Sequence, residues 1–369
     1  MARLFNPWTR TLKDNGEGMI DAAHIARKTF FAMGRSMNLR ALAPRSFAGV
    51  GGILMLHRVS PKQTAPLGIH AGLSVTPKFL DALFPALRAE GYDFVAMDDV
   101  LERIAHPNGR PFLAVTFDDG YKDNPDYAYP VLRKHNIPWT VYIAPGLVNG
   151  ETHLWWEIAE MAVAKLDQIT IATPQGRLSL ACRSGADKIS AFNRIQHHIM
   201  HDMPEESVAL FTRDLATLAG IDPDAHNRSE LMDWNQIRAI SLDPLCTIGS
   251  HTLHHFHLAR LNDAALKREF ALAIAAIEME TGIKPKHVAY PYGYKHAVGW
   301  RETELAGNLG HATGVTTRHG MLFAQHREVM TALPRISVNG KHQNVGDVKL
   351  MLSGLTSWLA HRHGGPVTL

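Results

Sequence analysis

The stretch FLAVTFDDG, residues 112–120, indicates the fold most directly. Its first six residues, FLAVTF, form an almost unbroken apolar run, which is typical of a strand buried on both faces of a parallel sheet. The run ends at two adjacent carboxylates, Asp118 and Asp119, and Gly120 then permits a tight turn. Because parallel α/β proteins assemble their sites at the carboxyl ends of strands, we expect a functional loop here. Taken alone, the triplet also fits an ordinary Asx turn.

Outward from this strand, segments typical of strands and of helices alternate along the chain. The pattern predicts buried strands at residues 52–59, 112–117, 138–143, 246–249, 287–290 and 311–316, and a short one after Pro334. It predicts helices at residues 76–92, 98–104, 124–135, 233–241, 262–281, 298–309 and 345–361. These six or seven βα units favour a (β/α) barrel over a doubly wound open sheet.

The alternation divides the chain into three parts. Residues 1–48 are expected to form a helical lead-in with a helix at 21–33, residues 49–345 the barrel, and residues 346–369 a C-terminal helix and tail. Residues 151–230 break the βα rhythm, because LWWEIAEMAVAKL predicts a helix, QITIAT with GRLSLAC a hairpin, and residues 187–218 a further helix. We interpret this stretch as a mostly helical insertion into the barrel.

Composition excludes several classes of protein. The 38 basic and 35 acidic residues are evenly spread, which argues against a nucleic-acid partner. Two cysteines, Cys182 and Cys246, make neither a disulfide framework nor a cysteine zinc ribbon. No window of about 18 apolar residues predicts a membrane span, and the first 28 residues lack the apolar core of a signal peptide. We therefore expect a cytoplasmic protein; peripheral contact with the inner membrane and the oligomeric state stay open.

A second polar cluster, GSHTLHHFH, follows the strand predicted at 246–249. His251 and His255 are four residues apart, so both imidazoles share one face if the segment is helical. Two histidines and a carboxylate are typical ligands of a zinc-type ion with one open position for water. Such a set leaves Asp118 free to act as a general base. His254 and His257 face elsewhere and are interpreted as supporting or surface residues.

These motifs together resemble the polysaccharide deacetylase (NodB-homology) family, carbohydrate esterase family four. TFDDG at 116–120, HTLHH at 251–255 and PYG at 291–293 match its first three motifs in order, and the resemblance covers residues 51–338. It implies a distorted (β/α)7 barrel of the NodB-homology type. It also implies a metal-dependent hydrolase that removes N-acetyl, or occasionally O-acetyl, groups from amino sugars.

The resemblance also implies roles for individual residues. Asp118 would be the catalytic base, and the backbone N–H of Tyr292 would help to form the oxyanion hole, flanked by Pro291 and Gly293. The ligands of one divalent metal ion would be Asp119, His251 and His255. Zinc is the expected ion, with cobalt, nickel or another first-row ion as alternatives.

The sequence departs from the family pattern in three places. The fourth motif, an Asp-containing segment that ends in tryptophan, is weak, because Trp300 in HAVGW has no accompanying aspartate. The other two departures concern the catalytic groups. The arginine that precedes the third motif is Ala289 here, and Arg335 in LPRISV is our candidate to supply the guanidinium beside Asp118. The late I-x-L-x-H motif, which carries the usual catalytic acid, is not evident, and His57 in LMLHRV is our preferred substitute. The alternatives are an ordinary surface arginine and a buried structural histidine.

Three functions follow from this interpretation. The first is the removal of acetyl groups from a polysaccharide, an oligosaccharide or a glycan precursor, with an acetylated glycan as partner. The second is a metal-dependent amidase or imidase that acts on a small non-sugar molecule. The third is a catalytically silent glycan-binding relative. Trp155 and Trp156 of the insertion could stack on a sugar ring, although such a pair in a helix also fits a core position.

Overall fold

The computed structural model describes residues 29–34, 36–37, 39–62, 65–362 and 364–369. Residues 29–34 are helical. The rest of the helix predicted at 21–33 lies outside the described residues.

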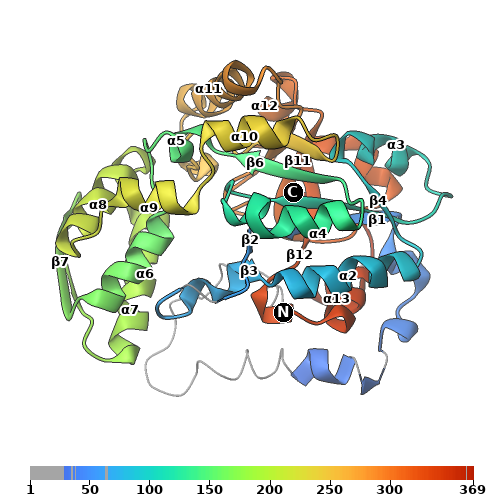
Figure 1. The fold of residues 1–369 in the computed structure, drawn as a ribbon, viewed down its shortest axis with the longest axis horizontal. Coiled ribbons are helices and arrows are strands. Elements are labelled where there is room, and N and C mark those ends of the chain that lie inside the picture. The colour runs from blue at the N-terminus through green and yellow to red at the C-terminus, as the bar shows by residue number, and fades with distance from the viewer. Residues whose placement is uncertain (1–28, 35, 38, 63–64, 363) are drawn as a thin grey trace.

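Seven parallel strands close into a ring at the centre of the molecule (Figure 1). In chain order they are β1 (Gly51–Leu56), β5 (Phe112–Phe117), β6 (Trp139–Ile143), β9 (Cys246–Ser250), β10 (His287–Ala289), β11 (Thr313–His319) and β12 (Leu333–Ser337). The ring closes because β1 pairs with β5 on one side and with β12 on the other. A short strand, β4 (Asp93–Val95), pairs with β5 outside the ring. The predicted (β/α)7 barrel is therefore confirmed.

The apolar runs in the sequence are explained by burial on both sides of the barrel wall. Every residue of β1, β5, β6 and β12 is buried. One face of these strands fills the barrel interior and the other contacts the surrounding helices, so no polar alternation is expected. The strand predicted at 52–59 is wrong at its end, because β1 stops at Leu56 and residues 58–59 form a separate strand.

Helices surround the ring (Figure 1). They are α2 (Pro77–Ala89), α3 (Val100–Ala105), α4 (Tyr129–Lys134), α5 (Pro145–Val148), α10 (Trp234–Ser241), α11 (Asp263–Thr281), α12 (Trp300–Asn308), α13 (Val345–Leu352) and α14 (Leu355–His361). The single helix predicted at 345–361 is wrong. Gly354 breaks it with φ of 75°, and a Cβ there would lie 1.9 Å from the carbonyl oxygen of Phe47.

Residues between β6 and β9 form a helical group on one side of the barrel (Figure 1). It contains α6 (Trp155–Lys165), α7 (Gly185–His197), α8 (Glu205–Leu218), α9 (Pro223–Glu230) and the antiparallel hairpin of β7 (Gln168–Thr173) and β8 (Gly176–Ala181). The continuous helix predicted at 187–218 is wrong in its middle, where a π-helical turn, His198–Asp202, and Pro204 separate α7 from α8. The helical run ends because Met203 and Pro204 have an extended backbone, with ψ of 136° and 142°.

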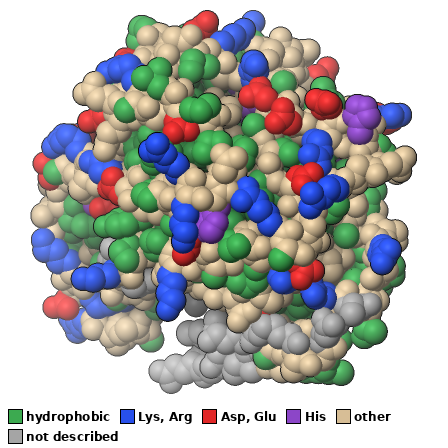
Figure 2. Space-filling view, turned by 45° about the vertical axis from the view of Figure 1, so that its right-hand side comes forward, with side chains coloured by type: hydrophobic (Ala, Val, Ile, Leu, Met, Phe, Trp, Pro, Cys, Tyr) green, Lys and Arg blue, Asp and Glu red, His purple; other side chains and the backbone are tan. Residues whose placement is uncertain are grey.

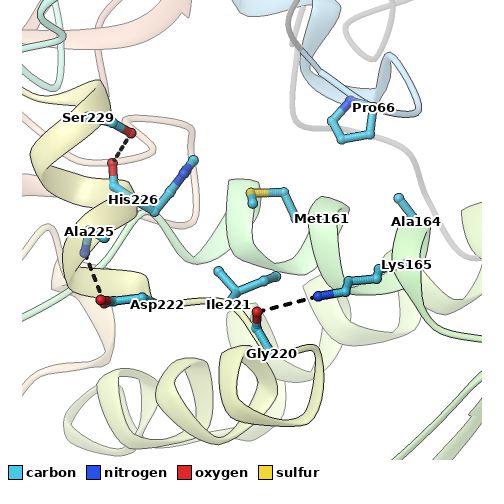
Figure 3. Close-up of a pocket in the computed structure, with 10 residues that line it drawn as sticks. All are labelled: Pro66, Met161, Ala164, Lys165, Gly220, Ile221, Asp222, Ala225, His226 and Ser229. Atoms are coloured by element: carbon cyan, nitrogen blue, oxygen red, sulfur yellow. Dashed lines mark hydrogen bonds between the residues drawn. The ribbon is translucent and has the colours of Figure 1, made fainter.

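The surface carries charges of both signs. Figure 2 shows lysine and arginine side chains interspersed with aspartate and glutamate over the face that it presents. A groove of about 650 Å³ lies between α6, the turn before α9 and Pro66 (Figure 3). None of its lining residues is one of the predicted site residues. In the described part of the chain, no helix is both long enough and apolar enough to cross a membrane.

Candidate active site

The three sequence motifs meet at the carboxyl ends of β5, β9 and β10, and each contains an unusual backbone conformation. Asp119, Thr252, His255 and Tyr292 have φ between 60° and 72°. They are four of the six non-glycine residues with positive φ in the described part of the chain. Such conformations are unfavourable for residues with a Cβ and gather where function requires them. The backbone therefore marks this end of the barrel as the site.

Asp119, His251 and His255 form a buried triangle of ligand atoms. The Asp119 Oδ1 lies 3.3 Å from the Nε2 of His251 and 3.5 Å from the Nε2 of His255. All three ligand atoms lie within 4.8 Å of one another. Two donors bound to one tetrahedral ion at about 2.0–2.2 Å are roughly 3.3–3.6 Å apart. The spacing of these side chains therefore fits one divalent ion.

The electrostatics of the three side chains also fit a metal ion. The Nδ1–H of His251 donates to the carbonyl of Ala289 at 2.7 Å, which leaves Nε2 as the atom that faces Asp119. Burial lowers the pKa of His255 to about 3, helped by His251, so this imidazole is neutral. Burial alone would raise the pKa of Asp119, but its bond with His251 and the neighbouring histidines hold that pKa below its usual range. Burial alone would lower the pKa of His251, but its bond with Asp119 outweighs burial and raises that pKa. Zinc prefers a carboxylate and neutral imidazoles, so an ion bound here would take the place of the proton on His251.

The histidine segment reaches this geometry without a helix. After β9, residues 251–257 run as an irregular loop, and the left-handed residues Thr252 and His255 turn it so that both imidazoles face Asp119. The helical explanation of the spacing is therefore wrong, although His251 and His255 do converge. His254 instead contacts Glu269 at 2.6 Å and Glu151 at 3.1 Å. His257 is buried and contacts the hydroxyl of Tyr294 at 3.1 Å.

Arg335 makes a bidentate bond to Asp118. Its Nη1 donates to Oδ1 and its Nη2 to Oδ2, both at 2.7 Å, while its Nε donates to the carbonyl of Thr316 at 2.9 Å. The side chain is buried, so the alternative of an ordinary surface arginine is wrong. Burial alone would raise the pKa of Asp118, but the guanidinium outweighs it and holds that pKa below its usual range. The guanidinium missing at Ala289 is thus replaced by one from β12.

His57 lies beside the same carboxylate. It follows β1, is 9% exposed, and its Nε2 lies 3.8 Å from the Oδ2 of Asp118. The ring nitrogen is therefore close enough to Asp118 for both residues to contact one small substrate group. The structure therefore places His57 at the site.

The Tyr292 turn packs against β11 beside His255. The Thr317 hydroxyl donates to the Tyr292 carbonyl at 2.6 Å. Gly293 has φ of 55°, and a Cβ there would lie 2.5 Å from the Thr317 nitrogen, which explains the glycine. The rings of Tyr292 and His255 are 5.0 Å apart between centroids. Pro291, which precedes this turn, is also buried.

The two tryptophans are not exposed sugar platforms. Trp155 and Trp156 are 3% and 1% exposed. Trp156 packs 5.2 Å from the His255 ring, and its Nε1 donates to the hydroxyl of Tyr121 at 3.1 Å. They form the wall between the helical group and the site, in line with the core alternative.

Sequence reasoning missed residues that support the site from the turn after Asp119. Tyr121 is buried, and the guanidinium carbon of Arg58 lies over its ring, 4.5 Å from the Tyr121 ring centroid. Asp123 and Asn124 are buried and bind the segment that holds His57. Nothing in the string YKDN separates these residues from an ordinary polar loop, so no sequence signal pointed to them.

Comparison with known proteins gives the family. The family model described as "Polysaccharide deacetylase" matches residues 105–308, more than half of the chain. The chain therefore belongs to the polysaccharide deacetylase family, and it is a hydrolase of the class that cleaves the amide bonds of acetylated sugars. The match includes the first three motifs and leaves His57 and Arg335 outside. No curated protein matches the sequence significantly.

Solved structures share the fold. A deacetylase from Streptococcus pyogenes, PplD in complex with acetate, is 18% identical with a TM-score of 0.51, over 78% of this chain and 92% of that chain. A polysaccharide deacetylase from Bacillus cereus is 15% identical with a TM-score of 0.50, over 82% of this chain and 68% of that chain. At these identities the likeness concerns the fold alone.

Proposed function

We propose that the protein is a metal-dependent hydrolase that removes the N-acetyl group of an amino sugar within a polysaccharide, an oligosaccharide or a glycan precursor. The observation that carries the proposal is the triangle of Asp119, His251 and His255 beside Asp118. We take zinc as the ion, with cobalt or nickel as alternatives, because the ligand set accepts several first-row metals. A bound ion would polarise the acetyl carbonyl and make a water molecule more acidic.

In this proposal Asp118 is the general base. The bidentate bond from Arg335 fixes the plane of the carboxylate and keeps it ionised. Each carboxylate oxygen still has a free lone pair, because an ionised carboxylate has about four acceptor positions. Asp118 can therefore accept the proton of the attacking water while Arg335 holds it in place.

His57 and Tyr292 complete the proposed chemistry. A protonated His57 would donate its proton to the nitrogen that leaves as the amine, since an amide nitrogen is a poor leaving group until it is protonated. The backbone N–H of Tyr292, flanked by Pro291 and Gly293, would stabilise the negative charge that develops on the acetyl oxygen. Membership of the family favours an acetylated sugar over a small non-sugar amide, and the complete ligand set argues against a silent relative.

The test is product analysis on N-acetylated chitooligosaccharides with zinc-loaded protein. We expect acetate and new primary amines in equal amounts, and neither product from Asp119→Ala. Asp263→Asn is the control, because Asp263 is an exposed aspartate outside the site, with a side chain that is 88% exposed. Acetate without amine would indicate O-deacetylation, and no acetate with any first-row metal would contradict the proposal.

A further inference from the structure

The segment that holds His57 is not fixed by the barrel ring. The last hydrogen bond between barrel strands before His57 runs from the Asp118 N–H to the carbonyl of Leu56, at 3.0 Å. The next two residues form β2 (Arg58–Val59), which pairs with β3 (Ser74–Val75) in a separate two-stranded sheet. His57 therefore lies in the break between two sheets, and another contact must set its position.

That contact comes from the turn after the first motif. The Nδ2 of Asn124 donates to the backbone carbonyl of His57 at 2.8 Å. The same nitrogen donates to the Oδ1 of Asp123 at 2.9 Å. Asp123 in turn accepts from the Val59 N–H at 3.0 Å and from the Arg58 Nε at 2.8 Å. Each of the three residues 57–59 is thus held by one of two neighbouring side chains.

Asn124 has the chemistry and the burial that this contact needs. Its side chain is fully buried, at 0% exposure. An amide nitrogen has two N–H donors, so one can bind a carbonyl while the other binds a carboxylate. An aspartate at this position would have no donor and would place a second negative charge against Asp123. The position therefore requires a short side chain with two donors.

The turn that holds Asn124 also holds the proposed base. Asn124 follows Asp118 by six residues, and its N–H donates to the carbonyl of Tyr121 at 3.1 Å. The Met232 N–H donates to the carbonyl of Gly120 at 3.0 Å, which fixes the turn from the other side. Asn124 thus connects His57 to the segment of Asp118 and Asp119 by a route that is independent of the barrel strands.

We propose that Asn124 is a positioning residue of the active site, which sets the distance between His57 and Asp118. The inference rests on the proposed role of His57 as the acid. Proton transfer requires a heavy-atom approach of about 2.6–3.2 Å, and a displacement of about 1 Å can reduce the rate roughly 100-fold. Loss of the Asn124 bond should therefore reduce kcat more than it changes KM.

The first experiment compares two buried asparagines. In Asn124→Ala we expect kcat for acetate release to fall about 10- to 100-fold, with KM changed less than about twofold and zinc content unchanged. Asn227→Ala is the matched control, because Asn227 is also buried and its Nδ2 donates twice, to the carbonyls of Leu147 and Thr152. It should lose stability without losing kcat. If Asn124→Ala does not fold, Asn124→Ser keeps one donor in a smaller side chain and replaces it.

The second experiment asks whether Asn124 acts through His57. In the double variant His57→Ala/Asn124→Ala we expect the kcat of His57→Ala alone, because the positioned group is already absent. Multiplied losses, or a normal kcat in Asn124→Ala, would overturn the inference. Crystal structures decide it independently of activity. In the Asn124 variant, His57 should move relative to Asp118, and an unmoved His57 would overturn the inference. Absence of acetate release by the unchanged protein would contradict only the proposed function.

Discussion

Arg335 and Asp118, which are 217 positions apart in the chain, form a buried bidentate ion pair with both distances at 2.7 Å. Arg335 is on β12 and Asp118 follows β5, and these two strands pair with opposite sides of β1. His57 follows β1 and lies 3.8 Å from the same carboxylate. The proposed base, the group that orients it and the proposed acid therefore come from three adjacent strands. This arrangement does not use β10, where Ala289 stands in place of the family's arginine.

Two substitutions of Arg335 distinguish the effect of its bidentate geometry on catalysis from the effect of its charge on stability. Arg335→Lys keeps a cation but cannot make two parallel bonds, so we expect kcat to fall about 10- to 100-fold. Arg335→Met leaves the Asp118 carboxylate buried without its partner and should lower the free energy of unfolding by about 3–5 kcal/mol. Acetate release and urea unfolding measure the two effects. A stable and fully active Arg335→Met protein would show that the pair has neither role.

Removal of the imidazole at position 57 tests the catalytic acid. We expect His57→Ala to reduce kcat by roughly 100-fold or more, because general acid catalysis contributes about that much. His342→Ala is the control, since His342 is also a buried histidine. The His342 ring packs on Phe31, with 4.2 Å between ring centroids. We therefore expect His342→Ala to retain the kcat of the unchanged protein. A near-normal rate in folded His57→Ala would remove His57 from the mechanism.

The turn of the third motif should be sensitive to a single methyl group. In Gly293→Ala the Cβ would lie 2.5 Å from the Thr317 nitrogen, so Tyr292 must shift and kcat should fall. Gly282→Ala is a matched control with φ of 72° and no neighbouring atom within 4 Å. It should cost about 1 kcal/mol of stability and leave kcat unchanged. Equal rates for the two variants would argue against a role for this turn.

Stability should decrease in mild acid because of a buried histidine outside the site. Burial lowers the pKa of His319 to about 3, and the neighbouring His361 and His342 act in the same direction. Below pH 6.5 the unfolded chain binds a proton at His319 that the native protein does not, so stability falls as the pH decreases from 6.5 to 3. Between pH 7 and pH 5 the free energy of unfolding should fall by roughly 2 kcal/mol more in the unchanged protein than in His319→Gln. An identical loss in both proteins would contradict this assignment.

The fold was largely predictable because the relevant signals are local. Apolar runs such as residues 112–117 indicate buried strands, and the alternation with helices indicates the barrel. The breaks were not predictable from local pattern. Gly354 interrupts a helical pattern with a left-handed backbone, and only glycine fits there because a Cβ would meet the carbonyl of Phe47, about 300 positions earlier in the chain. β1 stops at Leu56, and the carbonyl of the next residue, His57, accepts a hydrogen bond from the Asn124 side chain and not from a neighbouring barrel strand.

The site shows the same limit. Spacing and chemistry indicated His251 and His255, but a loop with left-handed residues, not a helix, makes them converge. A lone charge in an apolar strand makes Arg335 a candidate, but its contact with Asp118 depends on β12 and β5 lying on opposite sides of β1, which no local pattern indicates. Asn124 had no signal at all, since its role depends on a contact 67 positions away.

The central claim is that Asp119, His251 and His255 hold a catalytic divalent ion. The most direct measurement is the metal content of purified, zinc-equilibrated protein together with its rate of acetate release from chitooligosaccharides, before and after chelation. We predict one zinc per chain in the unchanged protein, loss of both zinc and activity on chelation, and recovery on readdition of zinc. Asp119→Ala should hold much less than one zinc and release no acetate. Full activity in metal-free protein, or full zinc content in Asp119→Ala, would contradict the account.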